Sequence, residues 1–144
     1  AGVNAMLPSG APQYEFYLSG VPVNLDGNSL PQSPEYSFAV GAEYDVHMGG
    51  DLIVTPRVDY YYQGDFYASQ FNRVVDRVDG YGNLNLQLTI APQEGPWYIR
   101  FFGQNMLDKD NVSGQFVGSQ AQGNFVNQTI LEPRRYGVAI GARF

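Results

Sequence analysis

Acidic and amide side chains cluster at two places in the sequence, and their oxygens are ligands of the kind that a calcium ion takes. Asp76 and Asp79 form one group, and Asp108, Asp110 and Asn111 form the other. Hard cations are bound by several such oxygens gathered in one place. Solvated loop carboxylates and Asx turns explain both groups better. We therefore predict no metal site.

Residues for catalysis or redox chemistry are scarce. The chain contains no cysteine and a single histidine, His47, which is expected to be an ordinary turn residue. This composition excludes a thiolate site and leaves little room for a His-based triad. The net charge of −6 argues against nucleic acid, which binds to basic surfaces. The sequence predicts no enzyme and no cofactor.

Aromatic side chains in and above the predicted loops are the better candidates for ligand contact. Together with Gln and Asn they suit the capture of a sugar, a siderophore or another amphiphilic ligand by stacking and hydrogen bonding. The alternative is that they cover one another or contact a partner. The candidates are Tyr61, Phe66, Tyr67, Phe71, Phe116 and Phe125.

The elements that position these residues are predicted to be strands. Apolar and polar residues alternate with period 2, while Gly and Pro leave no room for long helices. No apolar run approaches the roughly 20 residues of a membrane-spanning helix, and no signal peptide is predicted in the first residues. The strands are expected at 35–46, 51–62, 81–91, 96–107 and 134–144. Each has about the length that a tilted strand needs to cross a bilayer.

The predicted connections alternate in length along the chain. Tight turns are expected at 47–50 and 92–95, with Gly at positions where a positive φ is favoured. Long polar and aromatic loops are expected at 63–80 and 108–133, and residues 1–34 form a third one. Short turns at one end and long loops at the other are typical of outer-membrane barrels.

Alternation assigns every strand residue to one of two faces. One face is apolar, with aromatic residues toward both ends and aliphatic residues between them, as two bilayer interfaces favour.

Asn105 falls on this face, near the loop end, where headgroups and water are expected to satisfy its amide. Pro56 lies in mid-strand and predicts a bulge or weakened pairing. Eight charged residues of these strands fall on the other face: Glu43, Asp45, Asp51, Arg57, Asp59, Arg100, Arg135 and Arg143. The arginines Arg57, Arg100 and Arg143 are expected to pair with carboxylates there.

Three stretches resemble the C-terminal end of TonB-dependent outer-membrane receptors. Residues 103–110, Gly-Gln-Asn-Met-Leu-Asp-Lys-Asp, resemble the penultimate-strand signature of that family, in which an Asn and an apolar residue precede an Asp. Residues 132–144 are similar to its closing strand, and residues 26–35 look like the entry to its last five strands. The resemblance covers residues 24–144, with residues 1–23 as a variable extracellular loop.

The resemblance implies the C-terminal part of a 22-stranded antiparallel barrel that is closed by an N-terminal plug and energised by the TonB system. Residues 1–34 are then an extracellular loop, and residues 35–144 are the last five transmembrane strands rather than an independent domain. Long loops would be extracellular, and the short turns and the C-terminus periplasmic. The resemblance also implies a signal for the barrel-assembly machinery in the closing strand, at Tyr136, Val138, Ile140 and Phe144.

Five antiparallel strands are an odd number and cannot close a barrel, so the remaining strands and the plug are expected from another polypeptide. The predicted function is uptake of a scarce nutrient such as a siderophore, vitamin or oligosaccharide. Two alternatives stay open: a fragment of a passive porin-type barrel, and a soluble β-sandwich that binds a ligand.

Overall fold

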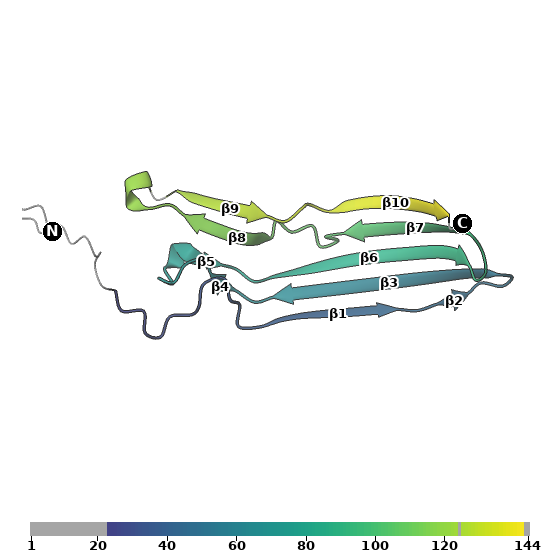
Figure 1. Cartoon of the computed structure of the whole chain (residues 1–144), viewed down its shortest axis with the longest axis horizontal. Helices are drawn as coiled ribbons and strands as arrows, with labels where there is room; N and C mark the ends of the chain where they lie inside the picture. Colours follow the sequence, from purple (N-terminus) through teal and green to yellow (C-terminus); the bar gives the residue numbers. More distant parts are fainter. Residues whose placement is uncertain (1–22, 124, 143–144) are drawn as a thin grey trace, which may run out of the picture.

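The structure is a computed structural model that describes residues 23–123 and 125–142 (Figure 1). Its main feature is one antiparallel sheet in which neighbours in sequence are neighbours in space, in the order β1-β3-β6-β7-β10. All five segments that alternation predicts as strands are strands in this sheet. Their bounds are β1 Ser37–Glu43, with β2 Val46–His47 continuing it, β3 Leu52–Gln63, β6 Tyr81–Pro92, β7 Trp97–Gln104 and β10 Arg135–Ala142.

The long connections contain short regular elements that the sequence analysis did not predict. The first holds the two-stranded ladder of β4 (Phe66–Tyr67) and β5 (Arg77–Val78), with the 3₁₀ helix η1 (Val74–Asp76) between them. The second holds β8 (Val112–Val117), the 3₁₀ helix η2 (Gln120–Gln122) and β9 (Val126–Ile130). No helix in the described ranges is long and apolar enough to cross a membrane.

The strand register aligns the apolar rows of neighbouring strands on one face of the sheet. Val58 lies opposite Leu86, and Leu88 lies opposite Phe101, which in turn lies opposite Val138. Because the side-chain period of a strand is two, a slip of one residue at any ladder would send that strand's apolar set to the other face. The division into an apolar face and a charged face is therefore confirmed from β1 across to β10. We call these the outer and the inner face.

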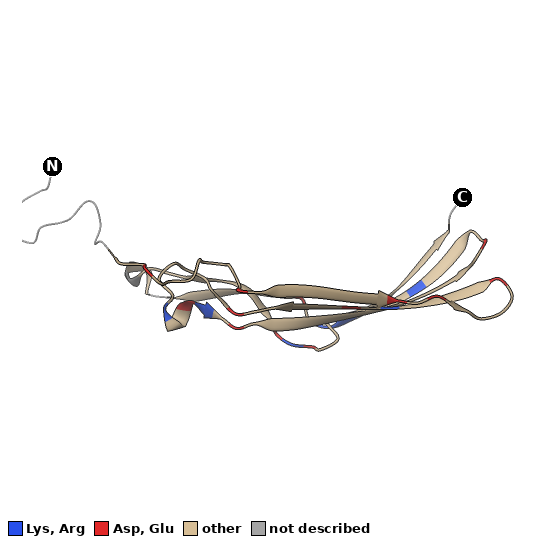
Figure 2. Ribbon diagram, turned by 90° about the horizontal axis from the view of Figure 1, so that it is seen from below, with Lys and Arg blue, Asp and Glu red and all other residues tan. Residues whose placement is uncertain are grey.

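The sheet is a single layer, and nothing in the described residues covers its outer face (Figure 2). Val40, Val138 and Ile140 on this face are 60%, 58% and 77% exposed. The buried apolar side chains are Phe66 and Val78, which both belong to the β4–β5 ladder and not to the main sheet. Within the described ranges, the main sheet thus has no hydrophobic core of its own.

The two borders of the sheet are open. β1 and β10 run in the same direction, because an odd number of antiparallel strands joins them (Figure 1). If the sheet curled until they met, they would form a parallel pair unlike any other in the sheet. No such closure occurs among the described residues. Each border leaves a row of backbone N–H and C=O groups without a strand partner.

Pro56 weakens the pairing of β3 with β1, as the sequence predicts. The backbone N–H of Tyr44 donates to the carbonyl of Pro56 at 3.2 Å, but proline has no N–H to return the bond. The ladder is interrupted at this point, between β1 and β2. On the other side of β3 the pairing with β6 continues through Pro56, which lies opposite Leu88. Pro56 therefore costs the sheet one hydrogen bond, the one that its missing N–H would donate to the β1 side of the ladder.

The two short turns use glycine for different reasons. Gly49 and Gly50 have φ of +83° and +65°, as predicted for the turn between β2 and β3. Gly95, in the turn between β6 and β7, does not adopt a positive φ, so the prediction is wrong there. A Cβ at Gly95 would lie 2.2 Å from the Cγ of Pro92, and the close approach itself requires glycine.

On the inner face, aromatic rings of β7 lie over glycines of β10. Phe102 faces Gly137 across the ladder, and Tyr98 faces Gly141. A Cβ at Gly137 would lie 2.2 Å from the Cζ of Phe102, and one at Gly141 would lie 2.3 Å from the Cε1 of Tyr98. The rings therefore occupy the space that side chains would take, and they hold the last strand in register.

We expect Gly137→Ala to lower the free energy of unfolding of the assembled protein by about 1–3 kcal/mol, because the Phe102 ring must leave its place. Gly114→Ala is the matched control, since a Cβ there meets nothing within 4 Å. Urea unfolding of both variants measures the difference. In a Phe102→Ala background the cost of Gly137→Ala should disappear; an undiminished cost would show that the ring is not the cause.

Candidate functional site

The long connections gather at the end of the sheet opposite its short turns (Figure 1). This loop cluster consists of residues 23–36, the β4–β5 connection at 64–80, and the β8–β9 hairpin. All six predicted ligand-contact residues lie in the loop cluster or next to it. Hydrogen bonds between side chains of these three segments fix their positions, and these positions determine which aromatic rings a ligand can reach.

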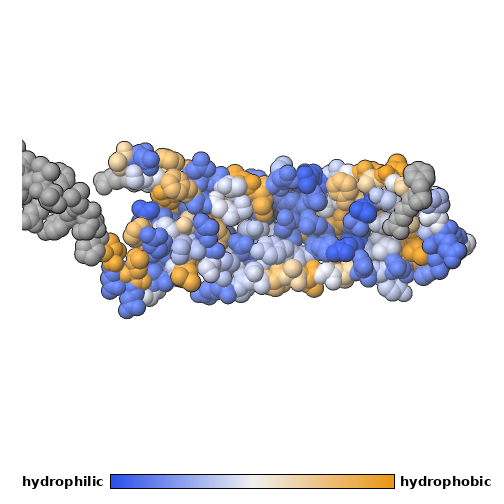
Figure 3. Space-filling model, in the orientation of Figure 1, coloured by the Kyte–Doolittle hydropathy of each residue, from blue (hydrophilic) through white to orange (hydrophobic). Residues whose placement is uncertain are grey.

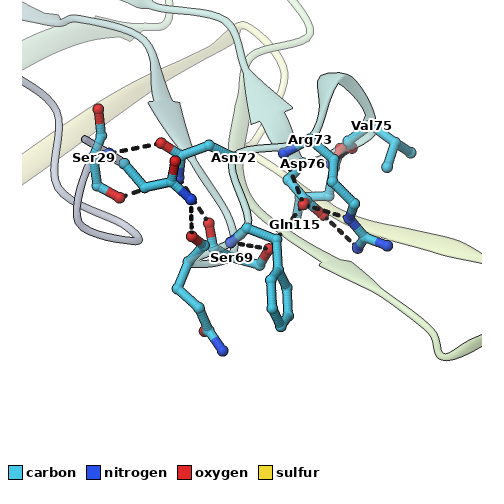
Figure 4. Close-up of polar contacts among 10 residues, drawn as sticks. Ser29, Ser69, Asn72, Arg73, Val75, Asp76 and Gln115 are labelled. Atoms are coloured by element: carbon cyan, nitrogen blue, oxygen red, sulfur yellow. Dashed lines mark hydrogen bonds and ion pairs between the residues drawn. The ribbon is translucent and has the colours of Figure 1, made fainter. Parts of the chain in front are cut away.

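A buried carboxylate organises the β4–β5 connection. Asp76 is fully buried and accepts hydrogen bonds from the Nε and Nη2 of Arg73, at 2.8 and 2.9 Å, and from the Oγ of Ser69 at 2.8 Å (Figure 4). The backbone N–H of Arg73 is a further donor at 3.3 Å. The guanidinium of Arg73 and the Ser69 hydroxyl hold the pKa of Asp76 below its usual value, although burial opposes this shift.

Asn72 joins the N-terminal described segment to the same connection. It has a φ of +48°, a conformation that asparagine tolerates better than most residues. Its Oδ1 accepts from the backbone N–H of Ser29 at 2.6 Å, and its Nδ2 donates to the Ser29 carbonyl at 3.1 Å (Figure 4). Asn28 adds a bond from its Nδ2 to the carbonyl of Gln70 at 2.8 Å. The Asn72 side chain thus satisfies both the N–H and the carbonyl of Ser29, as the backbone of a neighbouring strand would.

Gln115 joins the β8–β9 hairpin to η1. Its side-chain amide donates to the carbonyl of Val75, and its Oε1 accepts from the Nε2 of Gln128 at 2.8 Å. Gln115 lies on β8 and Gln128 on β9, so the bond to Val75 connects both strands of the hairpin to the other loop. The three segments of the loop cluster are therefore linked to one another.

Asn105 anchors the loop cluster to the sheet, and the prediction that it faces outward to water and headgroups is wrong. β7 ends at Gln104, three residues earlier than predicted, and Asn105 follows with a φ of +47°. It is buried, with 3% of its surface exposed. Its Nδ2 donates to the carbonyls of Lys109 and Glu132, at 3.2 and 3.0 Å, on either side of the β8–β9 hairpin.

The acidic groups weighed as calcium ligands have other partners or none nearby. Asp108 pairs with Arg134, with 2.9 Å between Oδ2 and Nη2. The Asp79 side chain is 94% exposed and lies 3.9 Å from Arg77. Within the described ranges, no three His, Asp or Glu side chains come together.

The six predicted ligand-contact residues separate into two groups. Phe71 and Phe116 line one cleft of about 610 Å³, between the β4–β5 connection and the β8–β9 hairpin. Phe125 lies beside them, with its ring centroid 6.0 Å from that of Phe116. These three rings are 45%, 60% and 47% exposed. The structure thus brings Phe71 next to two rings that lie 45 or more positions later in the sequence.

The other three residues point elsewhere. Tyr61 lies on the inner face, 6.1 Å from the ring of Tyr81, and its hydroxyl donates to the Oε1 of Gln63. Phe66 is 6% exposed and contributes to the small core of the β4–β5 ladder. Tyr67 is half-buried beside it. Phe66 therefore presents no ring face to a ligand.

The closing strand carries three of the four residues of the predicted assembly signal on its outer face. Tyr136, Val138 and Ile140 are 66%, 58% and 77% exposed there, in register with β7. Phe144 lies outside the described residues. These three side chains form an exposed apolar row, and whether the row is read during assembly stays a prediction.

The inner face carries the charges, and Arg57 pairs as predicted. It lies 3.2 Å from Glu43 on the neighbouring strand and 2.7 Å from Asp59 on its own. Arg100 is different, because it has no carboxylate partner in the part of the chain that the structure describes and lies over the Tyr98 ring, 5.3 Å from its centroid. Figure 3 shows a view in which hydrophilic residues predominate over the middle of the sheet.

Comparison of the chain with models of protein families, with curated proteins and with solved structures found no match. Function is therefore inferred from the two faces of the sheet, its open borders and the loop cluster. The pair of Arg73 with the buried Asp76 is the part of this cluster that the sequence did not predict. No local signal distinguishes Asp76 from a solvated loop carboxylate, because its burial depends on Ser69 and on the fold of the whole connection.

We expect Asp76→Asn to increase hydrogen exchange of the backbone amides in residues 64–80, because the amide replaces a charged acceptor of four hydrogen bonds. Asp79→Asn is the control, because its side chain is 94% exposed. The wild-type protein should also lose protection at low pH. Since folding lowers the pKa of Asp76, its stabilisation is complete above the unfolded pKa of about 3.9 and falls as the pH drops through the folded value. Unchanged exchange in Asp76→Asn would contradict this role.

Proposed function

We propose that this chain is the C-terminal wall segment of a TonB-dependent transporter in the bacterial outer membrane. The observation that supports this most strongly is the uncovered outer face. It is continuous from β1 to β10, apolar in every row, and has no second layer against it. A lipid bilayer covers such a face without any partner protein.

The distribution of aromatic side chains on the outer face supports the same environment. Tyr36 stacks on Tyr62 with 5.8 Å between ring centroids, and Phe38 stacks on Tyr62 at 5.6 Å, near the loop cluster. Trp97 lies at the start of β7, toward the short turns. Amphipathic rings are favoured at the two interfaces of a bilayer, with aliphatic residues between them.

The open borders set a condition on the segment that completes the barrel. Unpaired backbone groups in lipid cost several kcal/mol each, so β1 and β10 both need antiparallel neighbours. A second copy rotated about the barrel axis would bring β1 beside β10 in parallel, and a copy turned over would place its loop cluster at the opposite end. The completing segment therefore has an odd number of strands, with both border strands opposite in direction to β1 and β10.

The loop cluster supports a role in capture of a nutrient at the cell surface. In the proposed orientation it is extracellular, while the turns at 48–51 and 93–96 are periplasmic. Ligand passage through the barrel would require the plug and the TonB system, which the family resemblance implies. A soluble β-sandwich is disfavoured because no second sheet packs on the outer face among the described residues, but a passive porin shares the geometry of the wall and remains the alternative.

Cysteine labelling tests the location and orientation, since this chain has no cysteine of its own. Asp79→Cys in the loop cluster and Glu94→Cys in a short turn both place the thiol at an exposed site. On intact cells a membrane-impermeant maleimide should label position 79 and not position 94. Permeabilising the outer membrane should then allow labelling of both.

Labelling of neither position on intact cells, or of position 94 first, would contradict the proposed location or orientation. Deletion of TonB distinguishes the two transport classes in the same cells. An energised transporter loses uptake of its nutrient on deletion, whereas a passive porin keeps it.

A further inference from the structure

The cleft between the two long loops has the size of a small-molecule site. Its volume of about 610 Å³ lies within the roughly 300–1,000 Å³ of ligand pockets. Phe71 comes from the β4–β5 connection and Phe116 from β8, so two partly exposed rings reach one cleft from two loops. The bond between Gln115 and Val75 joins these loops directly beside the cleft.

The charge of the cleft is already compensated. Arg73 is the charged side chain among the described residues that line it. Its Nε and Nη2 are both bound to Asp76, and its guanidinium carbon lies 6.0 Å from the centroid of the Phe71 ring. The buried carboxylate neutralises the guanidinium, which then orients Phe71 by a cation–π contact. An anionic ligand gains little from such a pair.

The remaining polar groups are neutral and suit hydroxyl groups. The backbone N–H and the Oγ of Ser119 both donate to the Oε1 of Gln122, at 3.2 and 3.3 Å. These bonds hold the Gln122 side chain through its acceptor, and among the described residues its Nε2 donates to no other group, so it can donate to a ligand. Aromatic faces next to fixed amide groups match a ring with one apolar face and hydroxyls around its rim.

We propose that this cleft binds a sugar ring of an uncharged oligosaccharide, with Phe71 and Phe116 as stacking surfaces and Gln122 as a hydrogen-bond donor. The inference rests on the proposed function, because it takes the loop cluster as the outer entrance of the transporter. It narrows the nutrient to a neutral carbohydrate and sets it apart from anionic ligands such as a ferric tris-catecholate.

Binding to outer-membrane vesicles that contain the complete receptor tests the proposal. The probes are fluorescently labelled maltohexaose, cellohexaose, xylohexaose and mannohexaose, with a ferric tris-catecholate as the anionic comparison. At least one neutral probe should bind. Phe71→Ala and Phe116→Ala should each raise its Kd about tenfold, the loss expected for a stacked ring. Phe116→Trp should keep the affinity, and Phe38→Ala on the outer face is the control that should not change it.

Three results would overturn the proposal: none of the neutral probes binds, a neutral probe binds equally to the wild type and to both alanine variants, or the catecholate alone binds in a manner that depends on Phe71 and Phe116. Failure of the proposed function is recognised separately. In that case Asp79→Cys is not labelled on intact cells, whatever the result of the binding measurement.

Discussion

The structure depends on one physical constraint: a single-layered sheet has to satisfy an apolar face and two open borders at the same time. In water, the outer face would remain exposed at an unfavourable free energy of roughly 25 cal/mol per Å² of apolar surface. In lipid the face is satisfied, but each unpaired backbone group at a border becomes costly. Lipid against the face and further antiparallel strands at β1 and β10 together remove both problems.

The inner face and the loop cluster owe their order to contacts that the membrane does not provide. On the inner face, the rings of Phe102 and Tyr98 lie over glycines of β10 and fix the last strand. In the loop cluster, the buried carboxylate of Asp76 is stabilised because four donors satisfy it; a buried charge without partners is strongly destabilising. Asn105 connects this cluster to the rim of the sheet. The loop cluster is therefore held in place on the sheet and can present the exposed rings of Phe71 and Phe116.

Alternation along the chain was sufficient to predict the five strands and their faces, because a period of two depends only on local sequence. Alternation also restricts the register of the ladders, since a slip of one residue would take Val58, Leu86 or Phe101 to the other face. The burial of Asn105, Asp76 and Phe66 could not be predicted in this way. Asn105 depends on the carbonyl of Glu132, which is distant in sequence. Asp76 and Phe66 depend on how the whole β4–β5 connection folds around Ser69 and Val78.

The central claim is that the outer face lies against lipid, and site-directed spin labelling of β6 tests it most directly. Nitroxides at positions 86 and 88 lie on the outer face, and those at 87 and 89 on the inner face. In outer-membrane vesicles, oxygen dissolved in the bilayer should relax the labels at 86 and 88, and a water-soluble nickel complex should relax those at 87 and 89. Equal access of the nickel complex to all four positions would contradict the account.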